Sequence, residues 1–177
     1  MNSTNLSLDV PHPTLERRFE ELIETYGAPL ARLVSAYESS AAERQDLLQN
    51  IWFAIWRALP RFRGDCSDRT FVYRVAHNRA ISHTTRRRLD TTDLANASEL
   101  VNPAPQAEQS VETAQVRARL LAAMRRLPLT QREAVTLCLE GLSHREIAQV
   151  LGISENNVAV RLTRARAELA RLIGESP

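Results

Sequence analysis

Apolar residues recur at three- and four-residue steps along most of the chain, which is the spacing of amphipathic helices. Glycine is scarce, and the strict alternation typical of half-buried strands is absent. One acidic stretch, which contains Pro103 and Pro105, lacks helical periodicity and is typical of a linker. The pattern predicts an all-α fold with these parts: a mobile tail (1–14), a small helical domain (15–88), a flexible acidic linker (89–114) and a second small helical domain (115–173).

The aromatic residues are unevenly distributed between the two predicted domains. All nine lie between Phe19 and Tyr73, and none follows. A single mixed core would not segregate them in this way, so we expect two separate cores.

Charge is segregated as well, although the net charge is only +2. Residues 1–60 carry a net charge of −3 and residues 61–88 carry +6. The predicted linker carries five acidic residues and no basic one, while residues 115–177 carry +4. Two basic blocks on either side of an acidic spacer indicate two places where the protein could meet phosphate.

Several classes of protein do not fit the sequence. No apolar run approaches the roughly 20 residues that a membrane-spanning helix needs, so no membrane insertion is expected. The first residues do not have the pattern of a secretion signal. Cys66 and Cys138 lie far apart and form no CxxC pair, which fits two free thiols in the reducing cytoplasm.

The most informative segment lies near the C-terminus. Ser143 and Glu146 have the spacing of a capping box that opens a short helix, and Gly152 can make a sharp turn after it. Ser154 can cap the longer helix that follows. The four apolar residues expected to form the buried stripe of this second helix are Val158, Leu162, Ala165 and Leu169.

Another face of the second helix carries Asn157, Arg161 and Arg164, side chains that can contact base edges or phosphates in the major groove. Two helices with this turn predict a helix-turn-helix. The alternative is a plain helical hairpin with a solvated arginine face. The preceding residues favour the first interpretation, because Pro128 ends one helix and Thr130 with Glu133 has the capping-box spacing that would start another.

Residues 127–169 resemble region 4 of the sigma-70 family, which reads the −35 promoter element. This chain has Asn156, Asn157, Val158 and Ala159 where the family usually shows Gly-Thr-Val and a basic residue. The resemblance implies that the second domain binds −35 DNA and the polymerase β flap. The residues expected at the DNA are Arg145, Ser154, Asn156, Asn157, Arg161 and Arg164.

Residues 46–62 help to distinguish a factor that joins polymerase from a regulator that binds DNA alone. One face of this predicted helix is apolar, and the other places the aromatic ring of Phe53 among polar residues, as a partner surface would. The alternative is that Phe53 packs beneath a neighbouring helix. The segment resembles sigma region 2.2, which docks on the β′ clamp helices of polymerase; Asp46, Gln49, Trp56 and Phe62 match, while Asn50 replaces the usual Glu. The residues implied to bind polymerase are Asp46, Gln49, Asn50 and Phe53.

Residues 68–88 resemble regions 2.3 and 2.4, which capture an unstacked base of the −10 element. This segment has Phe71-Val72 where Trp-Leu is frequent and Ser82 where Asp is frequent. A flipped base needs a pocket with polar groups, and the strand backbone needs cations. The loop over 61–69 is the candidate rim and Asn78 the candidate reader. The residues implied at the −10 element are Arg63, Arg74, Asn78, Ser82, Arg86 and Arg87.

Catalytic and metal sites are weaker interpretations of the same residues. Cys66, His77 and His83 are possible zinc ligands by residue type, but their spacing matches no common zinc pattern. No Gly-x-Ser-x-Gly turn organises a hydrolase triad. We therefore expect no catalytic residues, no metal and no cofactor, and hence no enzyme.

The resemblance covers both predicted domains in the order of the family and shows no region 3, as in the extracytoplasmic-function (ECF) group. It implies an alternative sigma factor that binds core RNA polymerase and promoter DNA and is restrained by an anti-sigma factor. The acidic linker would thread toward the RNA channel of polymerase. Two alternatives remain at this point: a helix-turn-helix regulator that binds DNA without joining polymerase, and an interaction protein whose helices only sequester a partner.

Overall fold

The computed structural model describes residues 14–91 and 111–174, and every regular element in these two ranges is a helix, which confirms the all-α prediction. Residues 1–13 of the predicted tail (1–14) and residues 92–110 of the predicted linker (89–114) lie outside the described residues. At the two ends of the predicted linker the chain is still helical, up to Thr91 and from Val111. No helix within the described residues is long and apolar enough to span a bilayer.

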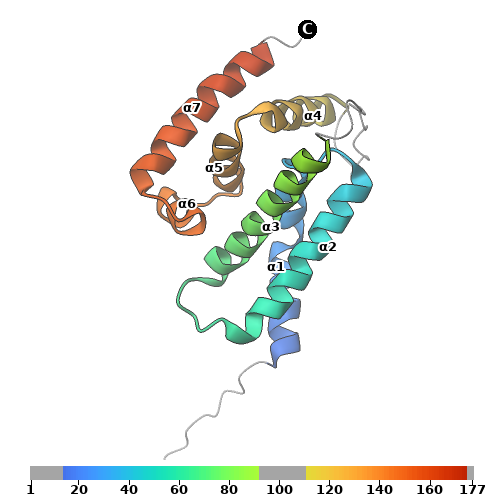
Figure 1. Cartoon of the computed structure of the whole chain (residues 1–177), viewed down its shortest axis with the longest axis vertical. Helices are drawn as coiled ribbons and strands as arrows, with labels where there is room; N and C mark the ends of the chain where they lie inside the picture. Colours follow the sequence, from blue (N-terminus) through green and yellow to red (C-terminus); the bar gives the residue numbers. More distant parts are fainter. Residues whose placement is uncertain (1–13, 92–110, 175–177) are drawn as a thin grey trace, which may run out of the picture.

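The N-terminal half is a bundle of three long helices (Figure 1). Thr14 caps the first helix, since its side-chain oxygen accepts a hydrogen bond from the amide of Arg17. Ser40 caps the second helix in the same way. All nine aromatic residues of the chain belong to this half. Its elements are α1 (Leu15–Ser35), α2 (Ala41–Ala58), a 3₁₀ turn (Leu59–Arg61) and α3 (Asp68–Thr91).

The C-terminal half is held together by aliphatic side chains, because it contains no aromatic residue. The last helix of this half, over Glu155–Gly174, packs against the helices over Val111–Arg126 and Leu129–Leu139. The short helix over His144–Leu151 contacts α3 on one side and the helices over Leu129–Leu139 and Glu155–Gly174 on others. Its elements are α4 (Val111–Arg126), α5 (Leu129–Leu139), α6 (His144–Leu151) and α7 (Glu155–Gly174).

The two halves share one hydrophobic core, so the prediction of two separate cores is wrong. Helix α6 has only eight residues, yet Ile147, Ala148 and Val150 are all buried. A helix this short buries so many residues because it contacts α3 on one side and α5 and α7 on others (Figure 1). The uneven distribution of aromatic residues therefore reflects two halves of different composition packed into a single core.

Candidate functional site

The exposed face of α2 carries the residues expected to bind polymerase. Its opposite face is buried, with Ile51 and Ile55 inaccessible to solvent. The Phe53 side chain is 59% exposed, and the guanidinium carbon of Arg57 lies 5.8 Å from the centre of its ring. Phe53 does not pack beneath a neighbouring helix of the described chain, so that alternative is wrong. The four exposed residues are Asp46, Gln49, Asn50 and Phe53.

An aromatic groove of about 760 Å³ continues this face toward α1. Phe19 of α1 lines it, and its ring centre lies 5.9 Å from that of Trp52 and 5.0 Å from that of Trp56, both in edge-to-face geometry. Glu16 and Glu20 place carboxylates on the α1 side of the groove. None of these three residues of α1 was predicted from the sequence to belong to a partner surface. Their helical spacing was visible, but only the packing of α1 on α2 brings them beside Phe53.

The residues expected at the −10 element lie along α3 and the loop before it. Arg63 and Arg86 are exposed, as are Asn78 and Ser82. The hydroxyl of Ser82 donates to the backbone carbonyl of Asn78 at 2.8 Å, which is an ordinary helical contact for serine. Arg74 is exposed as well, and its Nη2 donates to the carbonyl of Gln149 on α6 at 3.1 Å.

Arg87, also expected at DNA, is bonded to the buried carboxylate of Glu38 in the turn between α1 and α2. Glu38 Oε1 accepts from the amides of Ser39 and Ser40 at 2.6 and 3.0 Å, and Oε2 lies 3.2 Å from His83 Nε2. Burial disfavours the charged carboxylate, but the hydrogen bonds from Arg87, Ser40 and His83 outweigh it and lower the Glu38 pKa to about 2. Arg87 therefore has a structural contact whatever else it binds.

The same place holds a cluster of Glu38, Glu43 and His83, whose side-chain ligand atoms lie within 4.8 Å of one another. Both oxygens of Glu38 are already hydrogen-bonded, one of them to a guanidinium, so the donor set fits an ion-pair network better than a cation site. Neither Cys66 nor His77, which the zinc alternative would require as ligands, belongs to a group of three possible metal ligands among the described residues.

The helix-turn-helix forms as its capping residues predict. Ser143 Oγ accepts from the amide of Glu146 at 3.2 Å, and the Glu146 carboxylate accepts from the Ser143 amide at 2.8 Å, which is a complete capping box. Gly152 ends α6 with φ +66°, a left-handed conformation that glycine adopts without strain. Ser154 Oγ then accepts from the amide of Asn157 and starts α7.

Helix α7 has the two faces that its sequence predicts. The apolar stripe is buried, with Val158 and Ala165 fully inaccessible. Of the six residues expected at the −35 element, five are exposed and Arg161 is half-buried. The five are Arg145, Ser154, Asn156, Asn157 and Arg164.

Arg161 is the member of this set with a structural contact. Its Nη1 donates to the buried carboxylate of Glu133 on α5 at 3.3 Å, and its Nε donates to Asn157 Oδ1 at 3.1 Å. Glu133 is therefore not a capping residue: α5 begins at Leu129 with no side-chain cap, and the prediction of a box with Thr130 is wrong. Burial raises the Glu133 pKa, and the positive charge of Arg161 opposes the rise.

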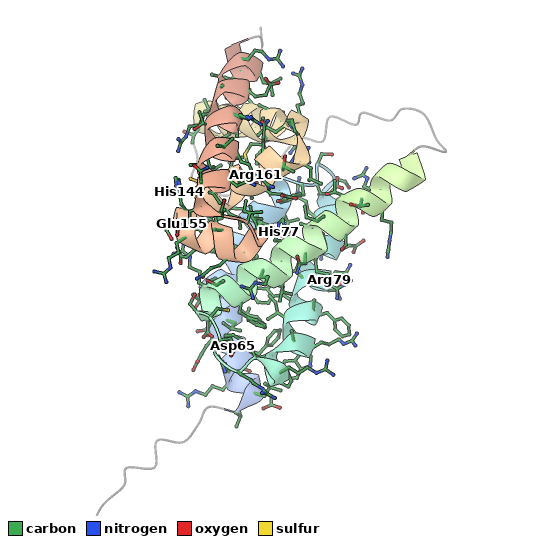
Figure 2. All side chains as sticks on the ribbon, turned by 60° about the vertical axis from the view of Figure 1, so that its left-hand side comes forward. Asp65, His77, Arg79, His144, Glu155 and Arg161 are labelled. Atoms are coloured by element: carbon green, nitrogen blue, oxygen red, sulfur yellow. The ribbon has the colours of Figure 1, made fainter. Side chains whose placement is uncertain are left out.

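His77 lies on α3 at the level where α6 crosses it (Figure 2). Its Nδ1 is buried and has no hydrogen-bond partner among the residues that the structure describes. Burial, followed by the positive charge of Arg161, lowers the His77 pKa to about 4. The imidazole is thus neutral near pH 7, at a position where two halves of the chain meet.

Comparison with known proteins agrees with this geometry. Two family models match, "Sigma-70 region 2" over residues 22–89 and "Sigma-70, region 4" over residues 117–169. The ECF RNA polymerase sigma factor SigM of Mycobacterium tuberculosis is 31% identical over 97% of this chain and 85% of its own length. The ECF RNA polymerase sigma-E factor of Escherichia coli is 30% identical over 85% of this chain and 84% of its own length.

Solved structures show the same arrangement of helices. CnrH in complex with the cytosolic domain of CnrY superposes with a TM-score of 0.67 at 25% identity, covering 91% of each chain. The sigma factor RpoE of Bartonella quintana, in complex with the anti-sigma factor NepR, gives a TM-score of 0.70 at 22% identity. That match covers 89% of this chain and 97% of the other, and at this identity it supports the fold.

Proposed function

This chain belongs to the sigma-70 family and is an alternative sigma factor of the ECF group, and from this premise we propose how its surfaces divide the work between polymerase and promoter. The observation that carries the proposal is the exposed face of α2 in the same chain as a helix-turn-helix. A regulator that binds DNA alone would need only the second feature, so that alternative is not favoured.

The face of α2 formed by Asp46, Gln49, Asn50 and Phe53 is proposed to bind the β′ clamp helices. An aromatic side chain that is 59% exposed among polar residues has a large apolar area to bury against a partner. The groove beside it extends this surface, and Glu16 and Glu20 supply negative charge for a basic partner helix.

The exposed side of α3 and the loop before it are proposed to bind the −10 element. Asn78 offers an amide that can hydrogen-bond the edge of an unstacked base, and Arg63 and Arg86 are exposed cations for the strand backbone. The other members of this surface are Arg74, Ser82 and Arg87.

The N-terminal part of α7 is proposed to enter the major groove at the −35 element. Asn156, Asn157 and Arg164 are exposed there, and amide and guanidinium groups pair with adenine and guanine edges respectively. Arg145 and Ser154 lie at the amino-terminal ends of α6 and α7, where side chains and amides suit phosphate. The C-terminal half is also proposed to contact the β flap.

We further propose that an anti-sigma factor covers these surfaces, by analogy with the complexes of CnrH with CnrY and of RpoE with NepR. Sigma factors are non-enzymatic initiation factors, and this chain is proposed to supply promoter specificity while polymerase performs the chemistry. It is proposed to act in the cytoplasm, where polymerase works.

The test is run-off transcription with purified core polymerase on a pool of genomic promoters. The wild-type chain should direct specific starts, and an Asp46→Ala/Gln49→Ala variant should lose both core binding in gel filtration and the transcripts. Glu24→Gln, an exposed change elsewhere on the N-terminal half, is the control and should retain both. If the double variant retained full core binding, the assignment of α2 would be wrong; if no specific start appeared with the wild type, the function itself would be wrong.

A second comparison separates DNA recognition from sequestration. Arg164→Ala should reduce transcription from a −35-dependent promoter while leaving core binding intact, because Arg164 is exposed and its side chain makes no hydrogen bond or ion pair with the other described residues. A protein that only sequesters a partner would tolerate this change.

A further inference from the structure

Three arginine side chains, which we call the arginine cluster, gather where the turn between α1 and α2 meets α4 and α5. Arg125, in the last turn of α4, donates from Nη1 to the backbone carbonyl of Ser35 at 3.1 Å. Arg44, in the first turn of α2, donates from Nη1 to the carbonyl of Ser39 at 2.7 Å. Arg132 of α5 donates from Nη2 to the backbone carbonyl of Arg125. All three side chains are half-buried, and each is bonded to an uncharged carbonyl.

Within the described residues, no carboxylate forms an ion pair with a member of the arginine cluster. Glu38 is the acidic residue whose charge acts on Arg125, but both of its oxygens already accept hydrogen bonds, one of them from Arg87. Glu43 of the same region lies with Glu38 beside His83. The carboxylates of this turn therefore neutralise the side that faces α3, and the arginine cluster keeps its positive charge.

The like charges of the arginine cluster oppose one another in this half-buried place. Burial, followed by the positive charge of Arg44, lowers the pKa of the Arg125 guanidinium. Burial lowers the pKa of Arg132 as well, with Tyr37 opposing the change and the charge of Arg125 adding to it. In addition, Arg132 Nε is buried and has no hydrogen-bond partner among the residues that the structure describes. A buried donor without an acceptor and a set of like charges both cost free energy, and a negatively charged acceptor is the kind of group that would offset both.

We propose that the arginine cluster binds a small phosphate-type anion, either inorganic phosphate or the phosphate group of a small phosphorylated compound. Planar guanidinium groups present paired N–H donors that match the oxygens of phosphate, and charge-assisted hydrogen bonds of this kind are strong. Because the three side chains are half-buried, the site suits a small anion better than the backbone of a nucleic acid. Arg44 belongs to the N-terminal half and Arg125 to the C-terminal half, so a bound anion would contact both halves and stabilise the folded chain. The site is independent of the role that we propose in promoter recognition.

The test measures the binding of inorganic phosphate, pyrophosphate and adenosine triphosphate to the full chain by isothermal titration calorimetry, with chloride used to keep the ionic strength constant. The wild type should bind one anion per chain. The midpoint of thermal unfolding, followed by circular dichroism, should rise by roughly 3–6 °C when the free anion is at about ten times its Kd. Saturable binding of inorganic phosphate would identify the free ion as the occupant, whereas binding of pyrophosphate or adenosine triphosphate alone would identify a phosphorylated compound.

Two variants remove members of the arginine cluster. Arg44→Gln and Arg125→Gln should each weaken anion binding by about tenfold or more, because each removes a charged donor. Arg119→Gln is the matched control, since it makes the same change of charge at an exposed position of α4 and should bind like the wild type. Phosphate also stabilises folded proteins in general through its exclusion from their surface, and that effect should be equal in all these variants. If Arg125→Gln lost its helical circular dichroism, Arg44→Gln would decide alone, because the bond of Arg44 to Ser39 is local to one turn.

Three results would overturn the anion site. The first is the absence of saturable binding of all three anions to the wild type. The second is equal affinity of the wild type and the folded cluster variants, which would indicate general attraction of anions to a basic protein. The third is a loss of affinity for a mixed-sequence single-stranded oligonucleotide by the same factor as for pyrophosphate, since the arginines would then be a nucleic-acid contact. Loss of pyrophosphate binding in the cluster variants, with wild-type behaviour of Arg119→Gln, would support the site whatever the result of run-off transcription.

Discussion

Replacing Glu38 with glutamine is expected to destabilise the protein by about 3 kcal/mol at pH 7. The carboxylate is almost completely buried and joins the turn after α1 to His83 and Arg87 on α3. Each tenfold change in proton affinity is worth about 1.4 kcal/mol, so a pKa lowered from 4.5 to about 2 corresponds to about 3 kcal/mol of folding free energy. Glutamine retains the shape and an acceptor for the Ser40 amide but removes the charge.

The sign of the pH dependence follows from the same pKa. In the folded state Glu38 holds its proton less tightly than in the unfolded state, so its contribution is fully present above pH 4.5 and is lost as the pH falls toward 2. The difference between wild type and Glu38→Gln should therefore shrink to roughly 1–1.5 kcal/mol at pH 3.

The assay is urea denaturation followed by far-UV circular dichroism at pH 7 and pH 3. Glu24→Gln is the control, because Glu24 is exposed on α1 and its substitution should change the free energy of unfolding by less than about 0.5 kcal/mol. A loss below about 1 kcal/mol at pH 7 for Glu38→Gln, or an equal loss at both pH values, would refute the reasoning.

Three further changes have defined outcomes. Ser143→Ala removes the cap of α6 and should lower the free energy of unfolding by about 1 kcal/mol in urea denaturation, whereas Ser143→Thr should have little effect. The His77 pKa is lowered from 6.5 to about 4, so the stability that depends on the neutral imidazole is fully present above pH 6.5 and is lost as the pH falls. Between pH 7 and pH 5 the free energy of unfolding should fall by roughly 2 kcal/mol, and this fall should disappear in His77→Asn. Arg161→Ala should weaken −35 binding and also lower the free energy of unfolding by about 1–3 kcal/mol, because it leaves the buried Glu133 carboxylate without its partner. Arg164→Ala should weaken DNA binding without changing stability, and equal melting temperatures for the two variants would contradict this.

The sequence predicted the features that depend on neighbours along the chain. The capping box at Ser143, the left-handed turn at Gly152 and the buried stripe of α7 all follow from spacings of three or four residues. The exposed position of Phe53 also follows from helical periodicity, once the buried face of α2 is identified.

The contacts that the sequence did not predict join residues far apart in the chain. Glu38 meets Arg87 across 49 residues and Arg32 meets Glu140 across 108, and no local pattern indicates which arginine a given carboxylate will find. Glu133 shows the converse error, since its spacing from Thr130 predicts a cap and its burial beside Arg161 decides otherwise. The single core was missed for the same reason, because α6 covers α3 only in three dimensions.

Three backbone carbonyls accept hydrogen bonds from arginines of the opposite half of the chain: Arg125 donates to Ser35, Arg69 to Glu140 and Arg74 to Gln149. The acceptors lie at or near the C-terminal ends of α1, α5 and α6, where backbone carbonyls have no partner within their own helix. The hydrogen bond from a guanidinium to such a carbonyl can be exchanged, because water can donate to the carbonyl instead and a phosphate can accept from the guanidinium. Because the Arg74 guanidinium is exposed, its bond to the carbonyl of Gln149 can be exchanged in this way without leaving a buried polar group unpaired.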